Sequence, residues 1–328
     1  MPLAKYDNLM QSRRPGRSEN FSMSARLQHR AASPRALSGH AMVKSPAPSA
    51  FDRIRKSLDG YFAKAVNARK RLLTEPYDAK LLHAWRVNLR RITATLKDVA
   101  QFSDDDLDDV HAYLRECREA TGETRDIDIL VDETLPGFVE KHAPEENDID
   151  TTTKVLKARQ AGARTQAVAA LKKYDLAVPM RALRHWEATL EPPTDSMTRK
   201  LASSSIEKHY RQLVKRAEKL DGGQKTLHRL RTATKKLRYT VELYAHLFPK
   251  QATGSWLKQL ADLQGHLGLA HDRLMGRKLI ATAAADDAKA PKPFRRWAKR
   301  TAYDASKDAM RSLSKLEHLR HYWRAHAN

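Results

Sequence analysis

Residues 226–242 read TLHRLRTATKKLRYTVE, and this stretch is the most informative one for the fold and the function of the chain. It contains no Gly or Pro, so its backbone is free to form a helix. At about 100° per residue, four cationic or titratable side chains share one narrow arc of that helix. They are His228, Arg231, Lys235 and Arg238, and the leucines lie on the opposite side. The pattern predicts a helix with an apolar back that packs in a core and a compact basic front that holds an anion.

An earlier stretch repeats this pattern. Residues 83–91 read HAWRVNLRR and residues 228–236 read HRLRTATKK, so both fit H-x-x-R-x-x-x-(R/K)-(R/K) with an offset of 145 (228 − 83). Further along, GETRD at 122–126 aligns with GLAHD at 268–272, at an offset of 146 (272 − 126). Two motifs that recur in the same order at nearly the same offset indicate a duplicated helical unit.

The sequence predicts an all-α fold of two helical bundles. Helical periodicity begins at Phe51, and no strand-like alternation persists anywhere in the sequence. We expect about four helices in each bundle, plus extra helices, with the two bundles related by a pseudo-twofold axis around a basic central groove or pore. Adjacent prolines at 192 and 193 separate a first half, 49–190, from a second half, 196–328. Residues 1–48 are basic and rich in Ser and Pro, and we expect a disordered tail there.

Glycines and prolines set the expected breaks between helices. Gly122 and Gly268 each end a helix, so residues 255–268 and 272–285 are expected to form two separate helices. The pair Pro136-Gly137 and the polar run 144–150 are expected in loops, and Asp104–Asp106 are expected to begin a helix.

The chain is strongly basic. Its 328 residues include 61 Lys and Arg against 39 Asp and Glu, a net charge of +22. Such a charge favours a polyanionic partner, which could be nucleic acid, an anionic membrane surface or an inorganic phosphate polymer; the alternative is a solvated surface that only keeps the protein soluble. No stretch is long and apolar enough to span a bilayer, so we expect a cytoplasmic protein. Cys117 is the only cysteine, which excludes an internal disulfide, and its helical context predicts a small buried apolar side chain.

Catalytic motifs are missing from the sequence. There is no G-x-S-x-G elbow, no P-loop and no G-x-G-x-x-G segment, so we predict no catalytic residue and no cofactor. His318 with His321, and His266 with His271 and Asp272, have helical spacings that could bind a metal weakly. Surface histidines explain both groups better, and we predict no metal site.

The two basic arcs suit a phosphate-rich ligand. Arg gives planar bidentate contacts to phosphate, and His beside phosphate is favoured in its protonated form. The alternative is that His83 and His228 are core histidines bonded to the backbone. Glu242 falls on the same arc, and we expect it to form a salt bridge with Arg238 or His228. Other basic residues could support binding, although each run is also explained by a solvated helix face: Arg125, Arg159, Arg164, Lys172, Lys208, Arg211, Lys215 and Arg216.

Aromatic residues decide between the candidate polyanions. Single-stranded nucleic acid is held by aromatic side chains interleaved with basic ones. Only Tyr239 lies near the second arc, and Trp85 falls on the apolar back of the first helix. A base-free phosphate polymer therefore fits better than DNA or RNA, which remain the alternative.

The motifs resemble a known family, the CHAD domain (conserved histidine α-helical domain). Besides the two His-containing helices, TRDIDIL at 124–130 and LADLQGHLGLAHD at 260–272 are similar to the R-D and L-Q-x-x-L-G-x-x-N-D segments of that family. The resemblance covers roughly residues 51–325 and implies two helical bundles around a basic pore that binds inorganic polyphosphate without catalysis. It implies that these residues line the pore: His83, Arg86, Arg90, Arg91, His228, Arg231, Lys235, Lys236 and Arg238.

The sequence departs from that family at two positions. Thr93 stands where the family often has a further Arg, and His271 stands where Asn is usual. No segment resembles the CYTH triphosphatase domain that often accompanies CHAD, so we expect a stand-alone binder that can associate with polyphosphate granules.

Overall fold

The computed structural model of the protein describes residues 48–103, 107–142, 146–283 and 291–326. All regular structure within these ranges is helical, which confirms the all-α prediction. Residues from Pro48 onward form one compact unit, which contains both predicted halves. The predicted tail up to residue 47 and the acidic run Asp104–Asp106 lie outside the described residues, so the expectations for them stay predictions.

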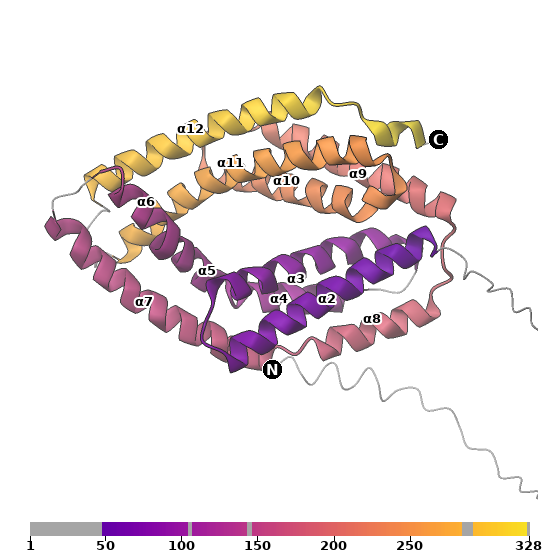
Figure 1. Ribbon diagram of the computed structural model, residues 1–328, viewed down its shortest axis with the longest axis horizontal. Coiled ribbons are helices and arrows are strands. Elements are labelled where there is room, and N and C mark those ends of the chain that lie inside the picture. The colour runs from indigo at the N-terminus through magenta and orange to yellow at the C-terminus, as the bar shows by residue number, and fades with distance from the viewer. Residues whose placement is uncertain (1–47, 104–106, 143–145, 284–290, 327–328) are drawn as a thin grey trace, which may run out of the picture. The chain divides into compact units, whose positions relative to one another are not determined.

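The helices of the first half come before the segment 190–194, and those of the second half follow it (Figure 1). The first half contains α2 (Ala50–Thr74), α3 (Ala79–Val99), η1 (Ala100–Phe102), α4 (Asp108–Glu119), α5 (Gly122–Ile129), η2 (Leu130–Thr134), α6 (Leu135–Val139), α7 (Glu146–Lys173) and α8 (Ala177–Thr189). The second half contains α9 (Asp195–Ala217), α10 (Gln224–Tyr244), η3 (Ala245–Leu247), α11 (Lys250–Ala283), α12 (Lys292–Glu317) and η4 (Tyr322–His326).

Several helix boundaries recur at the offset of the sequence repeat. Helix α9 begins 145 residues after α2 (195 − 50), α10 begins 145 after α3 (224 − 79), and η3 begins 145 after η1 (245 − 100). In Figure 1, α2, α3, α4 and α8 gather on one side of this unit, and α9–α12 gather on the other. The order of the helices thus repeats together with the sequence motifs.

Buried apolar faces fix how α3 and α10 are turned. On α3, Trp85, Leu89 and Ile92 have no exposed surface, and on α10 the same is true of Leu230 and Leu237. Burial of one such side chain contributes roughly 1.5–3 kcal/mol, so rotation of either helix would be costly. Because the apolar backs face the cores, the basic fronts of both helices must face away from them.

The first helix of each half begins at a side-chain cap. Ser49 and Asp52 form a reciprocal capping box at α2, and the Thr194 hydroxyl accepts a hydrogen bond from the Met197 N–H at α9. The two caps occupy equivalent positions of the repeat (194 − 49 = 145). The Ala50 N–H also donates to the Asp195 carboxylate at 2.7 Å, so the two helix starts are joined directly.

Three expectations about helix breaks are wrong. Helix α11 runs without interruption through Gly268, where two helices were predicted. A glycine inside a helix costs only about 1 kcal/mol relative to alanine, and the buried face of Leu260, Leu263 and Leu267 outweighs that cost. Pro136 and Gly137 lie within the short helix α6, where a proline in the first turn is tolerated. Helix α7 begins at Glu146, inside the predicted loop, of which residues 144 and 145 lie outside the described range.

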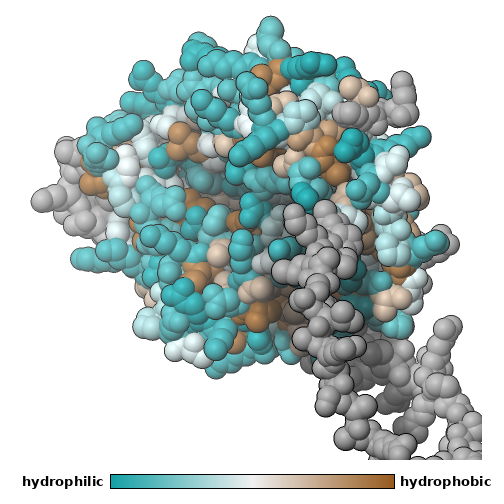
Figure 2. Space-filling view, turned by 45° about the vertical axis from the view of Figure 1, so that its right-hand side comes forward, coloured by the Kyte–Doolittle hydropathy of each residue, from teal (hydrophilic) through white to brown (hydrophobic). Residues whose placement is uncertain are grey.

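The surface is mainly hydrophilic. Figure 2 shows charged and polar residues over most of the visible face, with apolar residues in separate patches. None of the helices in the described ranges is long and apolar enough to cross a membrane.

Candidate anion-binding site

Helices α3 and α10 pack against each other and bring the two basic arcs together. Burial, followed by the charges of Arg125, Arg90 and Lys235, lowers the pKa of His83 to about 4. Arg90 likewise lies close enough to lower the pKa of Arg231. The first arc therefore faces residues of the second. We call these six residues the central cluster: His83, Arg86 and Arg90 from α3, and His228, Arg231 and Lys235 from α10.

Burial and mutual repulsion disfavour the charged forms within the central cluster. Burial, with Arg231 and Arg90 beside it, lowers the pKa of Lys235 to about 6. Burial also lowers the pKa of Arg86 to about 10, and it lowers the pKa of His228. An anion placed among these groups would relieve the repulsion and replace the lost hydration. The central cluster is thus arranged to gain from binding negative charge.

The arginines of the central cluster differ in their hydrogen bonds. Arg86 donates to the Arg118 carbonyl and, at 3.0 Å, to the Thr121 hydroxyl, so its guanidinium is held in place. The buried Nε atoms of Arg90 and Arg231 have no hydrogen-bond partner among the described residues. Buried polar groups are normally satisfied, so these two donors are available to an acceptor placed between the helices.

Two carboxylates accompany the central cluster. Asp126 and Asp272, which end the repeated GETRD and GLAHD segments, lie close to each other and to Arg86 and Arg231. Burial raises the pKa of Asp126, and the nearby Arg86 opposes that shift. The sequence repeat contained both residues, but the predicted site did not include them.

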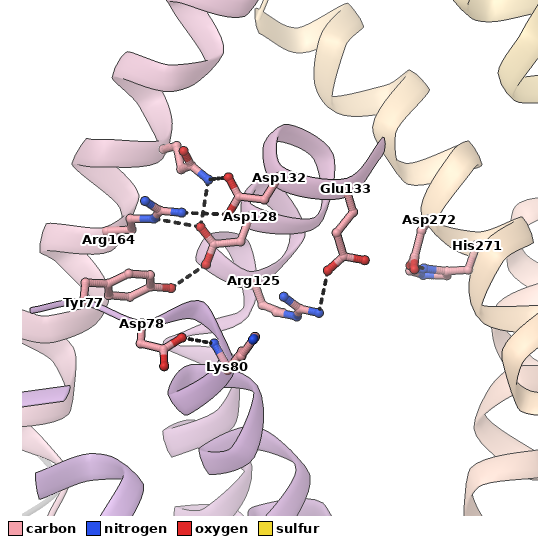
Figure 3. Close-up of polar contacts among 11 residues, drawn as sticks. Tyr77, Asp78, Lys80, Arg125, Asp128, Asp132, Glu133, Arg164, His271 and Asp272 are labelled. Atoms are coloured by element: carbon pink, nitrogen blue, oxygen red, sulfur yellow. Dashed lines mark hydrogen bonds and ion pairs between the residues drawn. The ribbon is translucent and has the colours of Figure 1, made fainter. Parts of the chain in front are cut away.

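His271 belongs to this carboxylate group. Its Nδ1 lies 3.1 Å from the Asp272 carboxylate (Figure 3). Its ring centroid is 5.7 Å from that of His228. His271 thus contacts both the Asp272 carboxylate and His228 of the central cluster.

Glu242 connects the two halves beside the central cluster. Its carboxylate lies 2.9 Å from Arg91 on α3 and 3.0 Å from Arg238 on α10. The predicted pair with Arg238 is confirmed, whereas His228 is not its partner. Arg91 also lies over the rings of Tyr61 and Tyr239, at 5.5 and 5.6 Å from their centroids. Two predicted pore residues, Arg91 and Arg238, are therefore already engaged with a carboxylate.

Lys236 lies outside the central cluster. The neighbouring charges that help to lower its pKa, after burial, are those of Lys97, Lys208 and Arg216. One residue further along a helix turns a side chain by about 100°, which carries Lys236 away from the arc of Lys235. The sequence motif grouped the two lysines because they are adjacent, but the helix separates them.

The predicted supporting residues have different surroundings. The charge of Arg125 helps to lower the pKa of His83, and its guanidinium lies 3.3 Å from the Glu133 carboxylate. Lys208 and Arg216 lie close enough to Lys236 to lower the pKa of that lysine. Arg159 pairs with Glu123 at 2.6 Å beside a cavity of about 560 Å³ that Arg86 and Asp126 also line. Arg211 pairs with Glu207 at 2.7 Å, and Lys172 and Lys215 are exposed.

Arg164 belongs to a separate polar network. It donates to Asp128 at 2.9 Å and to Asp132 at 2.8 Å, and it lies over the Tyr77 ring (Figure 3). Asp128 is fully buried and also accepts hydrogen bonds from Tyr77 and Gln160. This network holds α5 against α7, which gives Arg164 a structural role.

We expect Asp128→Ala to lower the free energy of unfolding by about 3 kcal/mol, because Tyr77 loses its acceptor and Arg164 and Gln160 keep only Asp132. Chemical denaturation monitored by circular dichroism measures the loss. Arg211→Ala, which breaks an exposed pair with Glu207, is the matched control and should cost less than about 1 kcal/mol. Equal losses in the two variants would contradict a structural role for the Asp128 network.

The candidate metal ligands and the single cysteine lie in surroundings typical of structural residues. Within the described ranges, no group of three or more His, Cys, Asp or Glu side chains could hold a metal ion. The His318 ring lies 2.6 Å from the Ser314 carbonyl, and His321 stacks on Trp323. Cys117 is buried as predicted, and burial raises its pKa to about 12, so it is a poor nucleophile.

Comparisons with known proteins agree with this architecture. The fold is similar to the crystal structure of the CHAD domain from the plant Ricinus communis, with a TM-score of 0.70 and 22% identity over 86% of this chain and 96% of that one. It is also similar to PptA from Streptomyces chartreusis, with a TM-score of 0.54 and 15% identity over 83% of this chain and 98% of that one. No curated protein matches the chain. The family model of the CHAD domain matches residues 56–281, more than half of the sequence, and the chain therefore belongs to the CHAD domain family.

Proposed function

We propose that this protein binds inorganic polyphosphate at the central cluster without catalysing its cleavage. The observation that carries the proposal is the meeting of two basic arcs, one from each half, whose buried Nε donors on Arg90 and Arg231 have no acceptor among the described residues. Membership of the CHAD family, whose domains bind polyphosphate, supports the same ligand.

The arrangement favours a polymer over a single phosphate. The basic side chains are spread along two helices, and His83 and Arg90 alone are separated by a rise of about 10 Å on α3. Arg86 is held by hydrogen bonds, whereas Lys235 is a flexible point charge. Such a row can contact successive phosphate groups of one chain.

The tyrosines beside the site argue against nucleic acid. Tyr61 and Tyr239 are the rings nearest to Arg91, and the Arg91 guanidinium lies over both of them. A base would have to displace this arginine before it could stack. The alternative of single-stranded DNA or RNA binding therefore lacks the stacking platform that such proteins use.

Competition between polymers tests the proposal. We expect long-chain polyphosphate to displace a fluorescent single-stranded oligonucleotide at a lower phosphate concentration than unlabelled DNA or RNA does. Measurements at several salt concentrations should give a linear fall of log affinity with log salt, because binding releases counterions. Stronger competition by nucleic acid at equal phosphate concentration would overturn the proposal.

A non-catalytic role fits the composition of the site. We infer that the protein binds the polymer in the cytoplasm and can associate with polyphosphate granules. Incubation with polyphosphate and Mg²⁺ should leave the chain-length distribution unchanged on a gel, whereas shortening would show an enzyme.

A further inference from the structure

Glu242 has a counterpart of opposite charge in the first half. The repeat offset of 145 relates Glu242 to Lys97 and Arg91 to Lys236 (242 − 97 and 236 − 91). Arg91 and Glu242 form an ion pair between α3 and α10 at 2.9 Å. The equivalent residues of the other half, Lys236 and Lys97, also lie near each other, but both are cations. Where one corner of the α3–α10 interface holds a salt bridge, the equivalent corner holds a repulsive pair.

Further cations surround this repulsive pair. The charges of Lys208 and Arg216, both on α9, help to lower the pKa of Lys236. His209 lies beside Lys208 and Lys236, and its Nδ1 is 2.9 Å from the Thr240 hydroxyl. We call Lys97, Lys208, Arg216 and Lys236 the open corner. Among the described residues, none of these four has an ion pair with a carboxylate.

The Asp98 carboxylate does not form an ion pair with the open corner. Asp98 lies within range of Lys208, but it is buried, with 7% of its surface exposed, and hydrogen bonds from Ser205 and Thr240 occupy it. Lys97, Lys208 and Lys236 are all exposed. Ala94 stands at the repeat position of Tyr239 (239 − 145), so the Tyr239 ring, one of the two beside Arg91, has no equivalent beside Lys236.

We propose that the open corner is a second anion site, which binds phosphate groups of the same polymer. These phosphates would take the place that the Glu242 carboxylate has beside Arg91 in the equivalent corner. Lys97 falls on the same arc of α3 as His83 and Arg90, at about −40° from His83. It lies about 10 Å beyond Arg90 along the helix axis. A phosphate chain held at the central cluster can therefore continue into the open corner, while the salt bridge of Glu242 blocks the equivalent path on the other side. This inference rests on the proposed function.

A charge reversal tests the open corner. Lys97→Glu places a carboxylate opposite Lys236 and so copies the Arg91–Glu242 pair. We expect an unchanged or higher melting temperature and about a tenfold loss of affinity for long-chain polyphosphate, since a charge-assisted contact is replaced by repulsion. Lys299→Glu, at an exposed position of α12, changes the net charge equally and should change affinity less than about twofold. Equal effects of the two variants would overturn the second site.

Lysine footprinting separates this inference from the proposed function. The full chain is acetylated with and without polyphosphate, and the modification of each lysine is read by mass spectrometry. Protection of Lys235 together with Lys97, Lys208 and Lys236 is the expected result, with Lys299 unprotected. Protection of Lys235 alone overturns the open corner and keeps the proposed function. Protection of the open corner alone overturns the central cluster as the binding site, and protection of neither overturns both. Orthophosphate at the same phosphate concentration should protect none of them; protection by it would overturn a site for the polymer.

Discussion

Replacing Arg90 and Lys235 together by Ala should reduce the affinity for long-chain polyphosphate by about a hundredfold or more. The two residues occupy equivalent positions of the repeat (235 − 90 = 145), and each lies where its charge acts on the opposite half. A hydrogen bond to a charged group contributes about 1.5–3 kcal/mol, so the loss of two such contacts exceeds the roughly 2.7 kcal/mol of a hundredfold change. The slope of log affinity against log salt should also become shallower by about one to two units.

Stability distinguishes this loss from unfolding. The pKa of Lys235 is about 6 in the folded protein, whereas an exposed lysine has a pKa of 10.5. The unfolded chain therefore binds more protons than the folded protein between these two pH values. Stability then rises with pH across that window, and the cost of deprotonating this lysine on folding destabilises the fold at neutral pH. The Arg90→Ala, Lys235→Ala variant should therefore melt at the same temperature as the parent protein or higher.

The matched control lies on the outer helix. Lys299 and Arg300 are exposed on α12, and their joint replacement by Ala removes the same charge. We expect less than about a threefold loss of affinity in this control. Equal losses in the two double variants would show that binding depends on net charge and not on the central cluster. Arg86 is left unchanged in the first variant because it also holds the Arg118 carbonyl and the Thr121 hydroxyl.

Helical periodicity predicted most of what positions the site. The apolar backs of α3 and α10 were predicted from the spacing of Trp85, Leu89, Leu230 and Leu237, and all four are fully buried. The repeat then indicated which faces had to meet. It could not indicate which cations would be neutralised, because ion pairs such as Arg91–Glu242 join residues 151 positions apart.

The sequence failed where local signals compete with packing. Gly268 resembles a helix end, yet the buried leucines around it keep α11 continuous. Lys236 matched the motif at Arg91, but its position on the helix turns it toward α9 and the open corner. Asp126 and Asp272 were visible as the ends of a repeat, while their contact with the central cluster depended on how α5 and α11 pack.

Binding of polyphosphate should take up protons at neutral pH, with Lys235 as the main source of the effect. Burial, followed by Arg231 and Arg90, lowers its pKa to about 6, so most of this side chain is neutral at pH 7.5 in the ligand-free protein. Phosphate oxygens favour the ammonium form and raise the pKa in the complex. Affinity should therefore increase as the pH falls from about 8 to 6, by up to tenfold per unit for each proton taken up.

Other groups add to the uptake in the same direction. His228 and His83 have lowered pKa values for the same reasons of burial and nearby cations, so they contribute further protons below about pH 6.5. Burial raises the pKa of Asp126, and protonation of this carboxylate would also favour a nearby anion. Long chains are the appropriate ligand because only their two terminal phosphates titrate near neutral pH.

Calorimetry in buffers of different ionisation enthalpy measures the uptake directly. At pH 7.5 we expect about one proton per binding event in the parent protein. Lys235→Arg keeps the charge but cannot lose it in this range, so its uptake should fall close to zero while binding persists. Uptake that is the same in both proteins would exclude Lys235 as the source. An affinity independent of pH between 6 and 8 would show that the lysine is already charged before the polymer arrives, and the repulsion inferred within the central cluster would then be too small to drive binding.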